Sequence, residues 1–221
     1  RHALWAALAG AGLAVVMALV LSPGPPVVCT YTGLSHITSA YHLAALEWQW
    51  PFPTDYPLTV PTLAAFFVLF MGRVPEALGA ANLLLFALAT GGIALLAGQL
   101  WRSRVAAWAG GLLTATLPLL LLFARGDVLS IGYLALSVWA VIFARRVACK
   151  EGGLWAQLGM AGATLLACQT RAEALAIWLV LAVLPMTLPR NDWRAGYKRI
   201  VPWLGGTLLL LLPHIANLFG E

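Results

Sequence analysis

Apolar stretches of about twenty residues recur along nearly the whole of this 221-residue chain, and no other feature limits its fold so strongly. A helix of about 20 apolar residues crosses the roughly 30 Å hydrocarbon core of a bilayer. Soluble domains carry roughly a quarter charged residues, whereas this chain has 10% charged and 62% hydrophobic residues. We therefore predict an all-α integral membrane protein that forms a single membrane domain over residues 1–221.

The distribution of positive charge predicts the orientation of this domain. No Lys or Arg occurs between Arg1 and Arg73, although cytoplasmic loops are usually enriched in both. Residues 22–57 are therefore expected outside, and the first span is expected to run outward. The next apolar segment, Leu58–Gly72, has only fifteen residues and contains Pro61. This length favours an interfacial or re-entrant helix at the outer surface over a span.

If that segment stays outside, seven spans follow and the later basic loops all fall inside. The predicted spans are Ala3–Leu21, Ala77–Leu100, Val105–Ala124, Val128–Ala144, Leu154–Thr170, Ala174–Leu188 and Ile200–Leu218. The inner basic residues are Arg102, Arg104, Arg145, Arg146, Lys150, Arg190, Arg194, Lys198 and Arg199. Tryptophans near the inner ends fit an interfacial belt: Trp5, Trp101, Trp155, Trp193 and Trp203. The segment Pro189–Arg199 is expected to be an inner surface loop that binds anionic lipid.

The same topology gathers ionisable residues at the outer face: Glu47, Asp55, Arg73, Glu76, Arg125, Asp127, Arg171 and Glu173. Charges near the membrane boundary are costly unless they are paired or functional. Arg125 with Asp127, and Arg171 with Glu173, can simply pair with each other or with lipid headgroups. Together, however, arginines and carboxylates suit a phosphate-bearing substrate, because Arg binds phosphate oxygens and a carboxylate can act as a base.

The stretch Asp55-Tyr56-Pro57-Leu58-Thr59-Val60-Pro61 resembles the Tyr-Pro-Pro type motif of GT-C membrane glycosyltransferases. That group includes protein O-mannosyltransferases and aminoarabinose transferases. The order that follows is also similar: Arg73 before a helix, Pro118 late in the next, Asp127 at an outer turn, then Thr170-Arg171-Ala172-Glu173. The resemblance covers about residues 30–190. It implies a module of seven transmembrane helices with juxtamembrane helices between the first and second, and transfer of a sugar from a polyprenyl phosphate carrier at the outer face.

The resemblance also implies roles for individual residues. Asp127 matches the acidic residue of the second outer loop, and Arg125 or Arg171 would bind the carrier phosphate, with Glu173, Arg73 and Tyr56 near the same site. The family usually has a carboxylate soon after the first span, but residues 22–46 contain none. Ser35 or His36 stands there instead, and Glu47 or Asp55 would have to substitute in catalysis.

An alternative of a different class is therefore a non-catalytic scaffold or accessory subunit of a larger membrane complex. The remaining partners predicted are membrane lipids and, for an active enzyme, the polyprenyl-phosphate sugar; nucleic acid is not expected, because the basic residues lie between apolar segments. The sequence identifies no cofactor, and its three cysteines lack a C-x-x-C metal spacing. The predicted location is a bacterial inner membrane. Because the first residue is Arg1, we also expect a fragment of a longer chain.

Overall fold

The structure is a computed structural model that describes residues 2–21, 31–46, 59–125, 128–170, 176–187 and 192–219. These ranges consist of helices and short turns, with no strand among them, and this confirms the all-α prediction. Three helical stretches are long and apolar enough to cross a membrane: α1 (His2–Leu21), α4 (Glu76–Leu100) and residues 130–148 of α7 (Val128–Ala148). They coincide with three of the seven predicted spans; seven spans in all remain a prediction.

The predicted span Val105–Ala124 is two helices, α5 (Arg104–Thr116) and α6 (Pro118–Arg125). The break falls at Leu117, whose backbone is extended with ψ 116°. A proline disfavours the helical conformation of the residue before it and has no N–H to donate. Just before the break, the hydroxyls of Thr114 and Thr116 donate to carbonyl oxygens one turn earlier. Such back-bonding bends helices.

The last three predicted spans differ from the structure in length or position. α8 (Gly153–Cys168) has 16 residues, and α9 (Ala176–Val183) has 8 and continues into the 3₁₀ turn Leu184–Thr187. α10 (Trp193–Phe219) begins seven residues before the predicted Ile200. Residues 193–199 are therefore helical, and the expectation of a surface loop is wrong there. The backbone hydrogen bonds of a helix form with polar as well as apolar side chains. The start of the apolar run at Ile200 therefore did not mark the start of α10.

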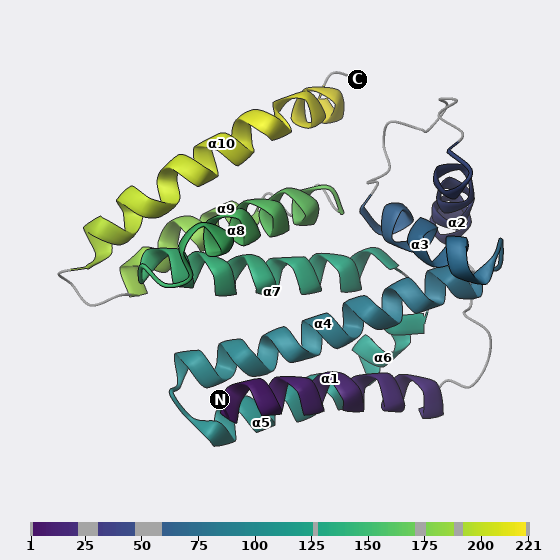
Figure 1. Cartoon of the computed structure of the whole chain (residues 1–221), viewed down its shortest axis with the longest axis horizontal. Coiled ribbons are helices and arrows are strands. Elements are labelled where there is room, and N and C mark those ends of the chain that lie inside the picture. Colours follow the sequence, from purple (N-terminus) through teal and green to yellow (C-terminus); the bar gives the residue numbers. More distant parts are fainter. Residues whose placement is uncertain are drawn as a thin grey trace.

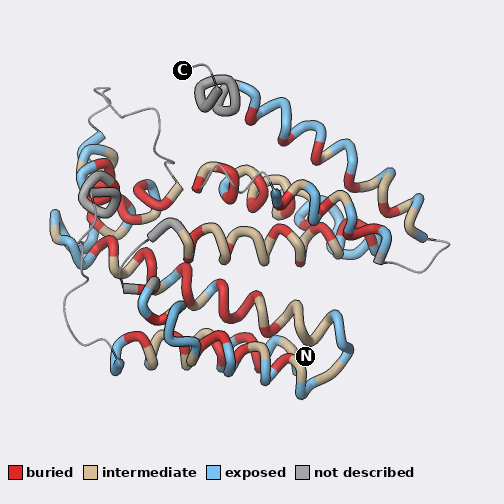
Figure 2. The backbone as a smooth tube through the Cα atoms, turned by 180° about the vertical axis from the view of Figure 1, so that it is seen from behind, coloured by how far each residue is buried: buried red, intermediate tan, exposed pale blue. Residues whose placement is uncertain are grey.

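Glycine and alanine bring α1, α4 and α5 into close contact. A Cβ atom on Gly10 of α1 would lie 3.2 Å from the Cα atom of Gly111 in α5. A Cβ atom on Gly91 of α4 would lie 3.3 Å from the carbonyl oxygen of Ala7, and one on Gly98 would lie 3.0 Å from Ala107 Cβ. Small residues allow this approach of helix backbones, and van der Waals packing is a main source of helix association in lipid. Figure 2 shows how the buried residues gather along these three helices.

A second packed group consists of α7, α8 and α10, with α9 beside them (Figure 1). Gly159 of α8 faces the ring of Phe143 in α7, where an added Cβ atom would lie 2.9 Å from three ring carbons. Gly159 therefore marks a close contact between α7 and α8. The indole Nε1 of Trp139 in α7 donates to the carbonyl oxygen of Leu88 in α4 at 3.1 Å, and so joins the two groups.

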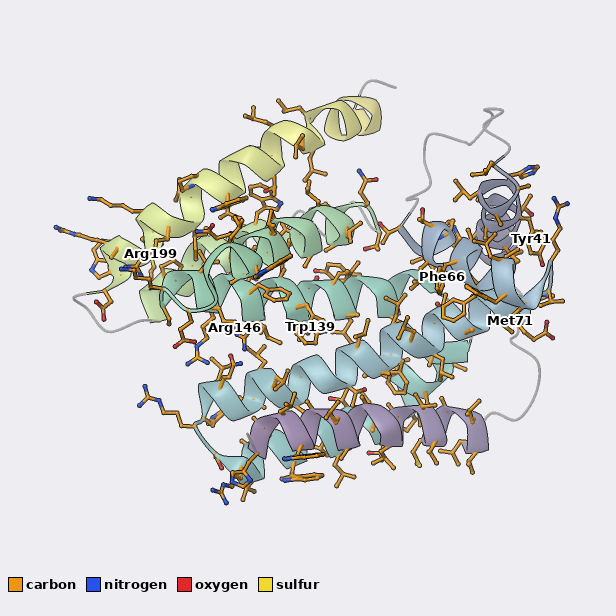
Figure 3. All side chains as sticks on the ribbon, in the orientation of Figure 1. Tyr41, Phe66, Met71, Trp139, Arg146 and Arg199 are labelled. Atoms are coloured by element: carbon orange, nitrogen blue, oxygen red, sulfur yellow. The ribbon has the colours of Figure 1, made fainter. Side chains whose placement is uncertain are left out.

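The chain order gives the molecule two distinct ends. α2 (Tyr31–Ala44) and α3 (Thr59–Met71) pack together at one end, beside the first turns of α4, and we call this the α2–α3 end (Figure 1). At the opposite end lie the α4–α5 turn, the α7–α8 turn and the start of α10; we call it the basic end. Its described cations are Arg102, Arg104, Arg145, Arg146, Lys150, Arg194, Lys198 and Arg199. Figure 3 shows Arg146 and Arg199 there, far from Tyr41 and Met71.

Hydrogen bonds hold the basic end together. Arg145 donates to Gln99 Oε1 at 3.2 Å, and Arg199 donates to the carbonyl oxygen of Ala148 at 2.6 Å. Three tryptophans near this end, Trp5, Trp101 and Trp155, are 66%, 68% and 83% exposed. Exposed indoles beside a cluster of cations are typical of a membrane–water boundary. The described cations that the charge distribution assigns to one side of the membrane therefore lie at one end of the molecule, and the identity of that side stays a prediction.

α3 does not extend along the full length of the bundle. Its 13 residues correspond to about 20 Å of helix, less than the roughly 30 Å of a hydrocarbon core. Its first turn lies beside Leu85 in α4, and its last residue is only five residues before α4 begins. Both ends of α3 therefore lie beside the first half of α4. This agrees with the expectation that the segment with Pro61 stays on one side of the membrane.

Candidate functional site at the α2–α3 end

Most predicted site residues lie outside the ranges that the structure describes. They are Glu47, Asp55, Tyr56, Asp127, Arg171 and Glu173. Arg125 is the last residue of α6, where only its helical backbone is described, and Arg73 is described in full. The arrangement of the site therefore has to be traced from the residues that border these positions.

Three of these bordering segments meet at Gly132, in the second turn of α7. A Cβ atom on Gly132 would lie 3.1 Å from Val60 Cγ2 of α3, and 3.6 Å from both Thr170 Cγ2 and Leu85 Cδ1. Val60 follows Tyr56 by four residues, Gly132 follows Asp127 by five, and Thr170 immediately precedes Arg171. We call this contact the Gly132 junction. It brings together chain segments that are distant in sequence and that each border a predicted site residue.

A hydrogen bond and buried side chains fix the junction. Thr59 Oγ1 donates to the carbonyl oxygen of Leu166 at 3.1 Å, which ties the first residue of α3 to the end of α8. Thr170 is fully buried and its hydroxyl donates to the carbonyl oxygen of Ala167 at 2.6 Å. Val60 and Ile131 are fully buried in the same core. The ends of α3, α7 and α8 at the junction are therefore held in place, since each of these side chains is packed or hydrogen-bonded.

Arg73 belongs to a different part of this end. It follows α3, whose 12 helical steps from Thr59 to Met71 separate it from the Gly132 junction by about 18 Å along the helix. Tyr41 of α2 lies within electrostatic range of both Arg73 and Glu76. The described residues thus do not place Arg73 at the Gly132 junction, where Asp127 and Arg171 are expected.

Tyr41 was not among the predicted site residues. Burial raises the pKa of its hydroxyl above the usual 10.0; the Glu76 carboxylate raises this pKa further, whereas the Arg73 guanidinium lowers it. Tyr41 therefore stays a neutral phenol, which can donate a hydrogen bond, at every physiological pH. No pattern in the sequence singles out Tyr41, because its role depends on neighbours that only the packing of α2 brings close.

His36 occupies the region where the family resemblance expects a carboxylate. It lies in α2 and is only 1% exposed, and it is adjacent in sequence to the buried Ile37. A buried histidine in a helix is not placed like an acceptor-facing base. Among the described residues of the α2–α3 end, the acidic residue is Glu76, which is exposed.

The described residues contain no group of three or more His, Cys, Asp or Glu side chains that could hold a metal ion. The arginines and carboxylates expected at this end remain the candidates for binding a phosphate group. No protein-family model, curated protein or solved structure matches this chain, and the likeness to GT-C glycosyltransferases therefore rests on the motifs of the sequence alone.

Proposed function

We propose that this chain is a GT-C-like membrane protein that holds a polyprenyl-phosphate sugar at its α2–α3 end, on the outer side of the membrane. In this proposal Arg125 and Arg171 bind the carrier phosphate. Asp127 is the catalytic acidic residue, and Glu47 or Asp55 accepts a proton from the acceptor. Tyr56 and Glu173 complete the sugar site.

The observation that supports the proposal most directly is the Gly132 junction. It joins the bordering segments of Tyr56, Asp127 and Arg171, three positions that the family resemblance selects independently. Phosphate recognition needs several donors at a common place, since each charge-assisted hydrogen bond has to reach the same group of oxygens.

The chemistry follows from the residue types. Arginine presents several N–H donors in a planar fork that matches phosphate oxygens. A carboxylate positioned at the acceptor hydroxyl can take its proton while the sugar leaves the phosphate. Burial of the polyprenyl chain would need only the apolar surfaces that the bundle already exposes, such as Phe66 and Phe70 on α3.

The test is sugar transfer by the chain in proteoliposomes that contain a radiolabelled polyprenyl-phosphate sugar. Asp127→Asn should reduce transfer by at least a hundredfold, as expected for loss of a catalytic acid or base. Asp192→Asn is the matched control, because Asp192 is exposed at the basic end. Equal transfer by the wild-type chain and Asp127→Asn would remove Asp127 from the mechanism, and no transfer by the wild-type chain would argue against the enzyme.

A non-catalytic scaffold is the second candidate, and the burial of His36 in α2 favours it. In that case the α2–α3 end keeps its packing without the base that the resemblance expects after the first span. Purification of the chain under mild detergent from its native membrane distinguishes the two. Fixed stoichiometry with other membrane subunits, together with absent sugar transfer, supports the scaffold; an active chain isolated alone contradicts it.

A further inference from the structure

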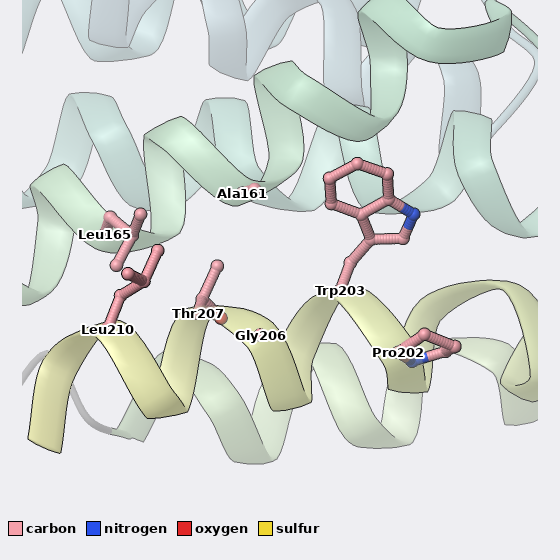
Figure 4. Close-up of a pocket in the computed structure, with 7 residues that line it drawn as sticks. All are labelled: Ala161, Leu165, Pro202, Trp203, Gly206, Thr207 and Leu210. Atoms are coloured by element: carbon pink, nitrogen blue, oxygen red, sulfur yellow. The ribbon is translucent and has the colours of Figure 1, made fainter.

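A groove lies between α8 and α10, and none of the predicted site residues lines it. Its cavity volume is about 380 Å³, within the range of roughly 300–1,000 Å³ that small-molecule sites occupy. Figure 4 shows Ala161 and Leu165 of α8 facing Trp203, Thr207 and Leu210 of α10, with the Trp203 indole directed toward α8.

The walls of this groove suit a hydrocarbon chain. The hydroxyl of Thr207 is already satisfied, since it donates to the carbonyl oxygen of Leu204 at 2.9 Å. Gly206 leaves the floor open, because a Cβ atom there would meet nothing within 4 Å. Ala161, Leu165 and Leu210 add only carbon atoms. Apart from the indole N–H of Trp203, an occupant of the groove therefore finds apolar contacts on the lining side chains.

The position of the groove matches one leaflet of a bilayer. From Pro202 to Leu210 the helix rises about 12 Å, close to half of the roughly 30 Å hydrocarbon core. Lys198 precedes Pro202 by one turn and Arg199 precedes Trp203 by one turn, so two cations lie where the groove opens toward the basic end. Arg194 precedes Lys198 by one further turn, and both side chains are exposed.

The two cations differ in their engagement with the protein. Arg199 is half-buried and donates to the carbonyl oxygen of Ala148 at 2.6 Å, which positions it at the end of α7. Arginine has five N–H donors, so this bond leaves others for a further acceptor. Lys198 is exposed, with no ion-pair or hydrogen-bond partner within the described part of the chain.

We propose that the groove binds an acyl chain of an anionic glycerophospholipid, with the lipid phosphate held by Lys198 and Arg199 at the basic end. Charge complementarity selects this occupant over a zwitterionic lipid, because only a net negative headgroup gains from the cluster of cations. The two cations lie at the opposite end from the proposed sugar-carrier site, and none of the predicted sugar-site residues lines the groove.

The chain offers a matched pair of variants for the test. Gly206→Leu places a side chain in the groove, whereas Gly205→Leu adds the same side chain next to it, outside the lining residues; neither Cβ atom would meet anything within 4 Å. Both variants should therefore fold. The measurement is native mass spectrometry of the full chain in detergent, titrated with phosphatidylglycerol or with phosphatidylcholine of identical acyl chains.

The expected result is a phosphatidylglycerol adduct that Gly206→Leu weakens at least tenfold and that Gly205→Leu retains. Replacing Lys198 by Gln should weaken phosphatidylglycerol binding about fivefold and leave phosphatidylcholine binding unchanged, since one cation near an anionic headgroup contributes about that much. Equal binding of the two lipids by the wild-type chain, or wild-type binding by Gly206→Leu, would overturn the proposal. A change in oligomeric state on Gly206→Leu without loss of lipid would identify the groove as a protein interface instead.

Discussion

Replacing Gly10 by Ala tests whether backbone contact between α1 and α5 holds the molecule together. The added methyl group would lie 3.2 Å from Gly111 Cα and 3.5 Å from Thr90 Cγ2. The first atom belongs to a helix backbone, so α1 and α5 must separate to admit the methyl group. Overpacking of this kind costs about 1–3 kcal/mol. Alanine also gains roughly 0.8–1.0 kcal/mol of helix propensity over glycine, which offsets part of that cost.

Gly12→Ala separates the two effects. Gly12 is on the same helix, and its Cβ atom would meet nothing within 4 Å. The propensity gain is common to both variants, so the difference between them measures the overpacking term alone. For a chain of this size, about 1–3 kcal/mol lowers the unfolding midpoint by roughly 2–12 °C. Circular dichroism of both variants during heating, in one detergent, provides the measurement. A Gly10→Ala variant as stable as Gly12→Ala would refute the close packing of α1 and α5.

Three further predictions concern the α2–α3 end and the orientation. Gly132→Leu should lower the free energy of unfolding by about 1–3 kcal/mol, because Val60 Cγ2 lies 3.1 Å from the new Cβ atom. The control Gly162→Leu should not lower it, because a Cβ atom at Gly162 meets nothing within 4 Å. Equal denaturation midpoints for the two variants would contradict the Gly132 junction. The pKa of Tyr41 is raised above 10.0, so its neutral form stabilises the fold below pH 10 and this contribution is lost as the pH rises further. Thermal stability between pH 9 and 11 should therefore fall more for the wild type than for Tyr41→Phe. Parallel curves of melting temperature against pH for the two proteins would argue against a buried phenol. Thiol labelling of intact cells should reach Thr38→Cys and not Arg102→Cys in a chain whose native cysteines are replaced, and the opposite pattern would reverse the orientation.

Long apolar runs made α1, α4 and α7 predictable. Their interiors carry few residues that interrupt a helix, so hydropathy placed most of their ends within a few residues of the observed bounds. The break at Leu117 was not predictable in the same way. Proline is tolerated within transmembrane helices when neighbouring groups satisfy the freed carbonyls, and the packing around Pro118 is known only from the structure. Hydropathy likewise placed the start of α10 too late, because the cationic turn at Lys198 and Arg199 remains helical.

The composition of the candidate site stays a prediction, and the sequence did not indicate its arrangement. The charge distribution grouped Arg73 with the other outer residues, since topology assigns a side of the membrane and gives no lateral position. α3 separates Arg73 from the Gly132 junction by its own length, and Tyr41 becomes its neighbour through the packing of α2.

Glycine explains why the most informative contacts had no signal in the sequence. In a chain with 21 glycines, a glycine at a helix contact and one facing lipid have the same neighbours along the chain. Gly132 meets Val60 and Thr170, whereas Gly162 meets nothing within 4 Å, although each lies between apolar residues in a helix. The difference depends on which helices are adjacent, and in lipid that choice is made by shape, since the tails are as apolar as the side chains. Under the proposed function, a bulky residue at Gly132 is therefore expected to disturb phosphate binding without removing any charge.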